Sequence, residues 1–300
     1  MIRQDLSSRS AALRTARVPF VHARVVLAER PTSAKPGDEA IVLADGSIEG
    51  FVGGECAEAT VRQQALEVLP SGEAVLLRIT PVPEPEQPGK RVAHNPCLSG
   101  GTLEVFLEPW VPPPLVQVVG DTPTGAALFA IGRPLGYAVS GWEGKVEPDA
   151  AAVVVASHGK NEDEALVAAL ESGVPYVGLV ASKRRGGAVL AALPVDEDLK
   201  AKVRTPAGLD IGAATAEEVA LSILAEIVAG QPRRARPGQP LVAAVCSETD
   251  PVCGMSVVVS DESLHSPHPD PSQVGRVVWF CGPGCQKAFL ADPSAYSLRP

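Results

Sequence analysis

The chain has 300 residues, of which 45% are hydrophobic and six are cysteines, and its formal net charge at pH 7 is −9. This length predicts two or three domains with apolar cores, and the negative charge argues against general nucleic-acid binding. No apolar run approaches the roughly 18 residues that a membrane span needs, and the polar first 17 residues indicate no signal peptide. Because irregularly spaced cysteines in a chain of this length are not typical of a disulfide framework, we expect reduced thiols and a cytoplasmic protein.

Residues 1–110 predict an α+β domain. An alternating, β-branched run predicts a strand, and Asp45-Gly46 between two further apolar runs predicts a hairpin. The Pro- and Glu-rich segment 81–90 is expected to be a mobile loop, and residues 1–17 to be helical or frayed. The remaining expected elements are strands at 21–28, 40–44, 47–52, 75–79 and 102–107 and a helix at 57–69.

Two cysteines beside double glycines organise this domain. Gly53 and Gly54 precede Cys56 where a predicted strand gives way to a predicted helix, and Cys97 precedes Gly100 and Gly101. A helix N-terminus favours a thiolate. Either cysteine alone is more often a small buried residue, but the repeated pattern favours one shared site.

The Pro-rich segment 109–114 predicts a stiff linker. After it, residues 115–230 alternate between strands and helices, which indicates a parallel sheet covered on both faces, as in a Rossmann-like domain. The expected strands are 115–119, 137–140, 150–156 and 176–180, and the expected helices are 124–131, 161–171, 183–193 and 215–229.

A glycine-rich turn follows the first of these strands. The run from Gly120 to Gly125 resembles the G-x-G-x-x-G dinucleotide loop, but Thr122 replaces the middle glycine that lets a pyrophosphate come close. The helix that begins near Thr124 can still bind phosphate, and Glu143 stands about 20 residues on, where a ribose-binding carboxylate is expected. A Rossmann fold with a degraded or repurposed cofactor site is the alternative.

Further polar residues follow the later strands, where doubly wound sheets bind ligands. His158 ends one strand, and Lys183, Arg184 and Arg185 follow the next as candidate phosphate ligands. The alternatives are a histidine satisfied by backbone groups and a solvated helix start. The loop 205–212 is a third candidate at this edge or a plain tight turn.

The last segment, residues 241–300, holds four of the six cysteines after a second linker at 231–240. Cys253, Cys281 and Cys285 suit zinc or another soft metal. Candidates for a fourth ligand are Cys246, His265 and His268; the alternative is a set of buried thiols without metal. Because the linker is rich in Pro and Arg, we expect this module to fold independently and to lack a packed interface.

In these residues the chain resembles the XdhC/CoxI family of molybdenum-hydroxylase maturation factors. The resemblance spans about residues 15–230, and the C-terminal module resembles a YHS domain. The family's first motif usually reads G-G-G-C, so Glu55 is a departure, while the second motif looks like the branch associated with carbon monoxide dehydrogenase. The motifs of the XdhC/CoxI resemblance are Gly53-Gly54-Glu55-Cys56 and the runs 97–106, 155–159, 176–185 and 205–212. The motifs of the YHS resemblance are the runs 250–255 and 279–281, the single residues Cys285 and Phe289, and the run 293–296.

The resemblance implies a non-catalytic chaperone that binds molybdenum cofactor, supports its sulfuration and delivers it to a molybdenum hydroxylase apoenzyme, with a cysteine desulfurase as a further partner and a homo-oligomeric state. We therefore expect Cys56 and Cys97 at the molybdenum end of the cofactor and the Rossmann edge at its phosphates. An NAD(P)-dependent oxidoreductase is the alternative, against which Thr122 argues.

Overall fold

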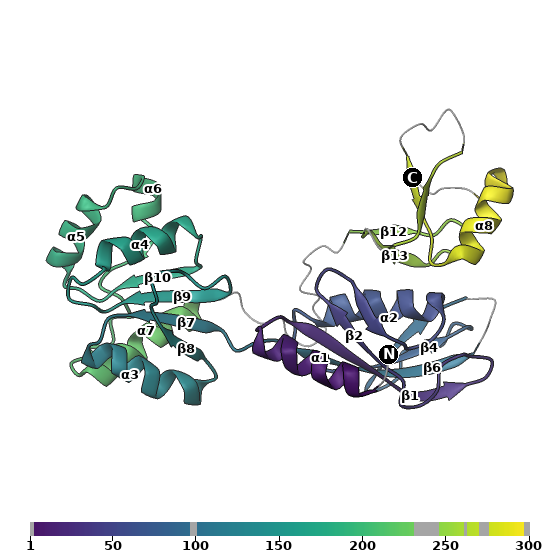
Figure 1. Cartoon of the computed structure of the whole chain (residues 1–300), viewed down its shortest axis with the longest axis horizontal. Coiled ribbons are helices and arrows are strands. Elements are labelled where there is room, and N and C mark those ends of the chain that lie inside the picture. The colour runs from purple at the N-terminus through teal and green to yellow at the C-terminus, as the bar shows by residue number, and fades with distance from the viewer. Residues whose placement is uncertain (1–2, 97–100, 231–245, 261–262, 270–275, 297–300) are drawn as a thin grey trace. The chain divides into compact units, whose positions relative to one another are not determined.

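The computed structural model describes residues 3–96, 101–230, 246–260, 263–269 and 276–296. Two compact units make up the chain. One unit combines residues 1–112 with 234–300, and the other spans residues 113–233 (Figure 1).

The N-terminal domain is built on a six-stranded sheet of order β3-β2-β1-β6-β4-β5. Every neighbouring pair is antiparallel except β4 and β5, which run parallel. The strands are β1 (Phe20–Glu29), β2 (Glu39–Leu43), β3 (Ile48–Gly50), β4 (Val75–Thr80), β5 (Lys90–His94) and β6 (Thr102–Trp110).

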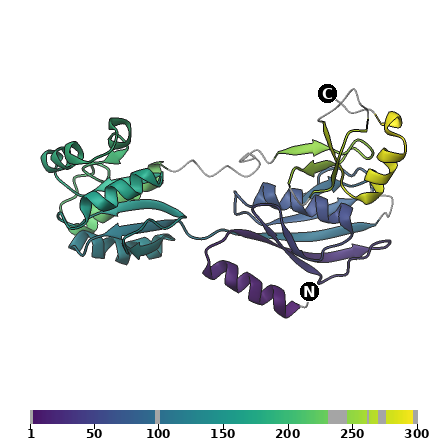
Figure 2. The same ribbon diagram turned by 45° about the horizontal axis from the view of Figure 1, so that its top comes forward.

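Two helices cover opposite faces of this sheet (Figure 2). The helix α2 (Glu55–Val68) buries Val61, Ala65 and Val68 in the main core of the domain, against side chains that alternate along the strands. The helix α1 (Arg3–Thr15) packs a smaller cluster against Phe20 and Ile41 on the other face. The burial of alternate residues therefore fixes which strand residues face α2.

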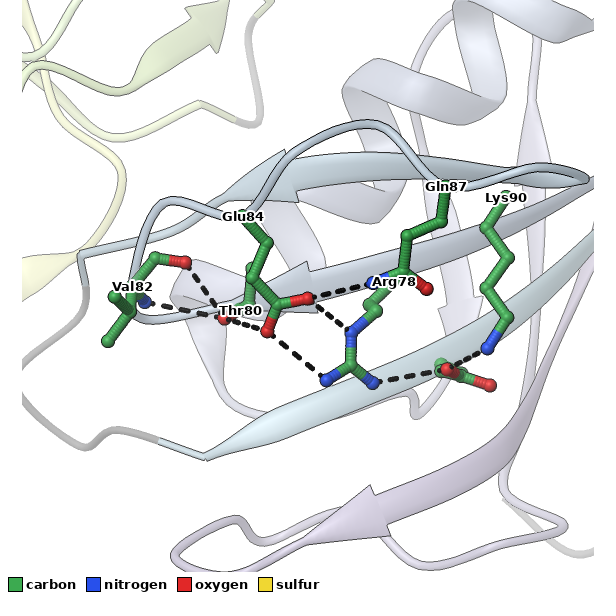
Figure 3. A network of polar contacts seen from close by, with 7 residues as sticks. Arg78, Thr80, Val82, Glu84, Gln87 and Lys90 are labelled. Atoms are coloured by element: carbon green, nitrogen blue, oxygen red, sulfur yellow. Dashed lines mark hydrogen bonds and ion pairs between the residues drawn. The ribbon is translucent and has the colours of Figure 1, made fainter.

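Away from α1, the face opposite α2 carries a polar network over β4, β5 and β6 (Figure 3). Arg78 donates hydrogen bonds both to Glu84, in the Pro-rich loop, and to Glu104 of β6. Lys90 also donates to Glu104, and Thr80 and Gln87 donate to Glu84. The loop expected to be mobile is thus attached to the sheet by Glu84.

The second unit is a five-stranded parallel sheet of order β11-β10-β9-β7-β8. Numbered within the unit, the strands run in the doubly wound order 2-1-3-4-5, whose ligand site lies at the switch point between the first and third strands. Its elements are β7 (Leu115–Val119), α3 (Pro123–Gly132), β8 (Ala138–Gly141), β9 (Ala150–Val155), α4 (Glu162–Glu171), β10 (Tyr176–Leu179), α5 (Lys183–Ala192), α6 (Glu197–Lys200), β11 (Val203–Arg204) and α7 (Ala216–Gly230), with a 3-10 helix at Arg133–Leu135.

The C-terminal module holds two short antiparallel pairs and one helix around Val278, Phe280 and Phe289. Its elements are β12 (Ser247–Thr249), β13 (Ser256–Val258), β14 (His265–Pro267), β15 (Val277–Trp279) and α8 (Pro283–Ala291), followed by a 3-10 helix at Pro293–Ala295. The expectation that this module has no packed interface is wrong, because β13 packs against α2.

The expected N-terminal α+β domain and Rossmann-like parallel sheet are confirmed. Within these two domains, the strands β5 and β11, the helix α6 and the part of β6 beyond residue 107 were not expected. The last of these corrects the linker prediction, because Trp110 pairs with Phe20 and stacks on its ring at 5.6 Å between centroids. Among the described residues, no helix is both long enough and apolar enough to span a bilayer.

Candidate functional site

Cys56 is the second residue of α2, as the sequence predicts. Gly54 is the N-cap and provides no side-chain capping bond, so the positive end of the helix dipole lies beside the thiol. Gly53 precedes it with a φ of 142°. The strand-to-helix turn therefore holds a thiol where a negative charge is favoured.

Asn95 attaches the second cysteine-bearing segment to α2. This side chain is 5% exposed, and its Nδ2 donates to the carbonyl oxygen of Cys56 and to Oγ1 of Thr60, both at 3.0 Å. Oγ1 of Thr60 in turn donates to the same carbonyl at 3.1 Å. Asn95 thus fixes the start of the second motif against the first turn of α2.

At the far end of that segment, Gly101 is pressed against a loop. Its φ is 96°, and an added Cβ would lie 2.1 Å from the carbonyl oxygen of Pro31. Only glycine combines this backbone conformation with such a close approach. Cys97 and Gly100, which stand between Asn95 and Gly101, lie outside the described residues.

A cleft of about 1270 Å³ collects these segments. It is lined by Gly54 and Cys56 of the first motif, by Asn95, Pro96 and Gly101 around the second, and by the loop that carries Arg30, Thr32 and Ser33. Arg30 and the two hydroxyls give this side of the cleft donors that suit an anion.

The other wall of the cleft comes from the C-terminal module. Cys253, Cys281 and Cys285 line it, and together with Met255 and Val257 they form one packed cluster with Cys56 and Ala59 of α2. Glu55, the departure from the usual family motif, lies on Gly282: a Cβ added there would be 3.3 Å from Glu55 Oε2 and 3.8 Å from Cys56 Sγ. No pattern in the sequence indicates that Cys56 meets these cysteines.

Asp250 organises the cysteine cluster. Its side chain is fully buried. Oδ1 accepts from the backbone N–H of Val252 at 2.8 Å and of Cys253 at 3.4 Å, and Oδ2 accepts from that of Cys281 at 2.8 Å. One carboxylate therefore holds together the two turns that carry the thiols.

The thiols perturb one another's protonation. The pKa of Cys253 is lowered, chiefly by its hydrogen bond with Cys281, and the pKa of Cys281 is raised by the same bond and by one with Cys56. Burial raises the pKa of Cys285. Cys253 is accordingly the most acidic of these three thiols.

The second unit has its own ligand edge, at the switch point of its sheet. A cavity of about 250 Å³ is lined there by Thr122, Thr124, His158 and Thr215, among others. Gly120, with a φ of 104°, lets β7 pass the end of β9, since an added Cβ would lie 2.4 Å from Ser157 Cα.

Thr122, which replaces the middle glycine of the fingerprint, caps α3. Its Oγ1 accepts from the backbone N–H of Gly125 at 3.2 Å. One amide that a phosphate would otherwise engage is therefore already satisfied. Glu143 follows β8 and does not line the cavity.

The three consecutive cations after β10 do not act together. Nη2 of Arg185 donates to both carboxylate oxygens of Glu162, at 2.9 and 2.7 Å, and Glu162 is only 4% exposed. Arg185 thus neutralises a buried carboxylate, which does not support the phosphate role expected for it. Lys183 and Arg184 are exposed in the first turn of α5 and do not line the cavity that holds His158.

Of the residues expected to bind metal, Cys253, Cys281 and Cys285 come together. Within the described ranges, the ligand atoms of these three cysteines and Asp250 all lie within 4.8 Å of one another. Cys246, His265 and His268 are not in this group. The sequence reasoning missed Asp250, although an Asp-Pro pair is typical of a turn in which the carboxylate accepts from nearby backbone N–H groups.

The fold and the cleft define a protein in which a cysteine-bearing α+β domain precedes a Rossmann-like domain. Family comparisons agree: residues 13–80 match the XdhC and CoxI family, and residues 116–227 match the XdhC Rossmann domain. Together these matches cover more than half of the chain, and the chain belongs to the XdhC and CoxI family.

Individual relatives are distant. The uncharacterized protein YqeB of Escherichia coli (strain K12) is 25% identical over 254 residues, which cover 75% of this chain and 46% of that protein. The chain thus spans about half the length of this relative. A solved structure described as a xanthine dehydrogenase from Bacillus halodurans is 16% identical and aligns with 77% of this chain and 97% of its own, with a TM-score of 0.35.

Proposed function

We propose that the protein is an accessory factor in the maturation of a molybdenum hydroxylase, of the carbon monoxide dehydrogenase or xanthine dehydrogenase type, and that it binds molybdenum cofactor and passes it to the apoenzyme. Membership of the XdhC and CoxI family supports this role. The observation that carries it is the cleft that Cys56 of the first motif lines together with Asn95, Pro96 and Gly101.

The chemistry of the cleft suits this cargo. The cofactor is an anionic dithiolene with a phosphate or a dinucleotide. A thiolate at Cys56 is a soft donor suited to the metal end, while Arg30, Thr32 and Ser33 are donors suited to oxyanions. We propose that Cys97 joins Cys56 at the metal end.

We propose a second contact on the Rossmann domain, where Thr124 and His158 line the cavity at the switch point. Doubly wound sheets bind nucleotides at this position. In this proposal the cavity takes a phosphate or nucleotide part of the cargo, with Gly120 as a neighbouring contact.

The proposed role is that of a carrier without chemistry of its own. The partners that follow from it are the apoenzyme and a cysteine desulfurase that supplies the sulfur ligand of the cofactor. A homo-oligomeric state and a cytoplasmic location are parts of the same proposal.

The test is to purify the full chain from cells that make molybdenum cofactor and to measure bound molybdopterin per chain. We expect Cys56→Ala with Cys97→Ala to lower it at least tenfold, Arg30→Ala to lower it less, and the matched control Cys246→Ala, at an exposed cysteine, to leave it unchanged. Absence of bound cofactor, or equal binding by the double variant, would contradict the assigned roles.

An NAD(P)-dependent oxidoreductase is the second candidate, which the doubly wound order and the cavity at the switch point favour. The capping of Gly125 by Thr122 opposes it. Fluorescence titration with NADH and NADPH discriminates between the two candidates. Micromolar affinity that is lost in His158→Ala would promote the oxidoreductase.

A further inference from the structure

The cysteine cluster of the C-terminal module has the spacing of a metal site. The Sγ atoms of Cys253 and Cys281 lie 3.5 Å apart, and those of Cys281 and Cys285 lie 3.6 Å apart. Four sulfurs at about 2.3 Å from a tetrahedral zinc ion lie about 3.8 Å from one another. Little movement would therefore bring these three thiolates onto one ion.

Asp250 is a poor fourth ligand in spite of its proximity. Both of its oxygens already accept backbone N–H groups, on Val252, Cys253 and Cys281. Turning the carboxylate toward a metal would break these bonds and leave the buried backbone N–H of Cys281 without its acceptor, which is unfavourable. Asp250 therefore positions the turns that carry the thiols.

Cys56 is placed to provide the fourth sulfur. It packs in the same cluster as the three thiols, and its Sγ would lie 3.8 Å from a Cβ added at Gly282. It is outside the group of ligand atoms that lie within 4.8 Å of one another, so it must move closer to the three thiols to share their ion. All four cysteines line the one cleft, which gives a metal ion a path from solvent.

The surrounding backbone also favours four thiolates. Cys56 is in the first turn of α2, and Cys285 is the third residue of α8. Two helix N-termini thus direct positive dipole ends at the cluster, which offsets the net negative charge that four thiolates leave around a divalent ion.

We propose that Cys56 of the N-terminal domain and Cys253, Cys281 and Cys285 of the C-terminal module form one tetrahedral site for a soft cation such as Zn²⁺. The site crosses between two parts of the chain that are about 200 residues apart in sequence. The inference goes beyond the proposed maturation role in two respects. Cys56 binds a second metal besides the cargo, and the ion joins the C-terminal module to α2.

The test uses the full chain, reduced and loaded anaerobically with Co²⁺ as a spectroscopic substitute for Zn²⁺. We expect one ion per chain, visible bands typical of tetrahedral cobalt, and near-ultraviolet sulfur-to-metal absorption in proportion to four thiolates. In Cys56→Ser this absorption should fall by about a quarter, and the dissociation constant for Zn²⁺ should rise at least tenfold. Cys246→Ser is the matched control and should behave as the parent chain.

An alkylation measurement gives an answer that does not depend on how Cys56→Ser folds. In the parent chain, Zn²⁺ should slow the labelling of Cys56 at least tenfold, and Cys281→Ser should abolish this protection while Cys246 labels equally in all cases. The proposal is overturned if the parent chain takes up no metal, if Cys56→Ser has the spectrum and affinity of the parent, or if Zn²⁺ protects the other three cysteines and leaves the labelling of Cys56 unchanged.

Discussion

Among the described residues of the candidate site, Gly101 is the one at which the backbone is most constrained. A side chain there meets both a φ of 96° and the carbonyl of Pro31, whereas Gly89 has a φ of 75° with nothing within 4 Å of an added Cβ. We expect Gly89→Ala to cost about 1 kcal/mol of unfolding free energy through its φ alone, and Gly101→Ala about 3 kcal/mol or more, because the loop must also move.

Urea unfolding measures this difference in a chain in which Trp142 and Trp279 are replaced by Phe, so that Trp110 reports on the N-terminal domain. Gly101→Ala should also reduce bound molybdopterin, since Gly101 and Pro31 both line the cleft. Equal losses of unfolding free energy in the two variants would mean that the loop of Pro31 moves without cost and that its close approach to Gly101 does not contribute.

For single residues, the sequence predicts the chemical setting of a side chain better than its contacts with distant residues. The glycines before Cys56 predict a thiol at a helix N-terminus, and the structure places it there. The meeting of Cys56 with Cys281 could not be predicted, because no local pattern encodes a contact between residues 225 positions apart in the printed sequence. The Pro- and Arg-rich linker instead predicted that the C-terminal module makes no packed interface.

Among the elements, the network on β4, β5 and β6 ties stability to pH. Hydrogen bonds from Lys90 and then from Arg78 hold the pKa of Glu104 below its usual range. A carboxyl whose pKa is lower in the folded state stabilises the fold above its unfolded pKa of about 4.3, and this contribution is lost as pH falls through the lower folded value.

Glu104→Gln removes that contribution. Glu104 is 8% exposed, so we expect a loss of roughly 1–3 kcal/mol at pH 7. This loss should shrink as the pH falls through the lowered pKa of the folded state, below which the parent carboxyl is itself protonated. Urea unfolding between pH 3 and 7 checks this. A difference that stays constant with pH would assign the loss to packing and not to charge.

Element by element, the predictable parts are those with strong periodicity. The strand that became β1, the hairpin around Asp45-Gly46 and the four-strand alternation of the second unit are all confirmed. The missed elements β5, α6 and β11 span two to five residues each, too few to establish a period. β5 in particular follows a Pro-rich run and pairs in parallel with β4, a long-range choice that its own residues do not specify.

On the scale of the whole molecule, the N-terminal domain and the Rossmann domain build their main cores without the C-terminal module. Among the residues that the structure describes, the main core of the N-terminal domain and the two cores of the Rossmann domain contain none beyond 230. What the module shares with α2 is the cluster around Cys56 and Ala59. We therefore expect a chain ended after Gly230 to keep its fold, with amide dispersion and thermal unfolding close to those of the full chain.

The same truncation should change how Zn²⁺ and molybdenum cofactor compete for Cys56. If Zn²⁺ and the cargo use the same thiol, added Zn²⁺ should lower bound molybdopterin in the full chain and a chelator should raise it, each at least threefold, while the truncated chain should respond to neither. Cys281→Ser in the full chain should behave like the truncation, which separates loss of the metal from loss of the module. A truncated chain that still responds to Zn²⁺ would place the competing ion elsewhere, because three of the four proposed ligands are then missing.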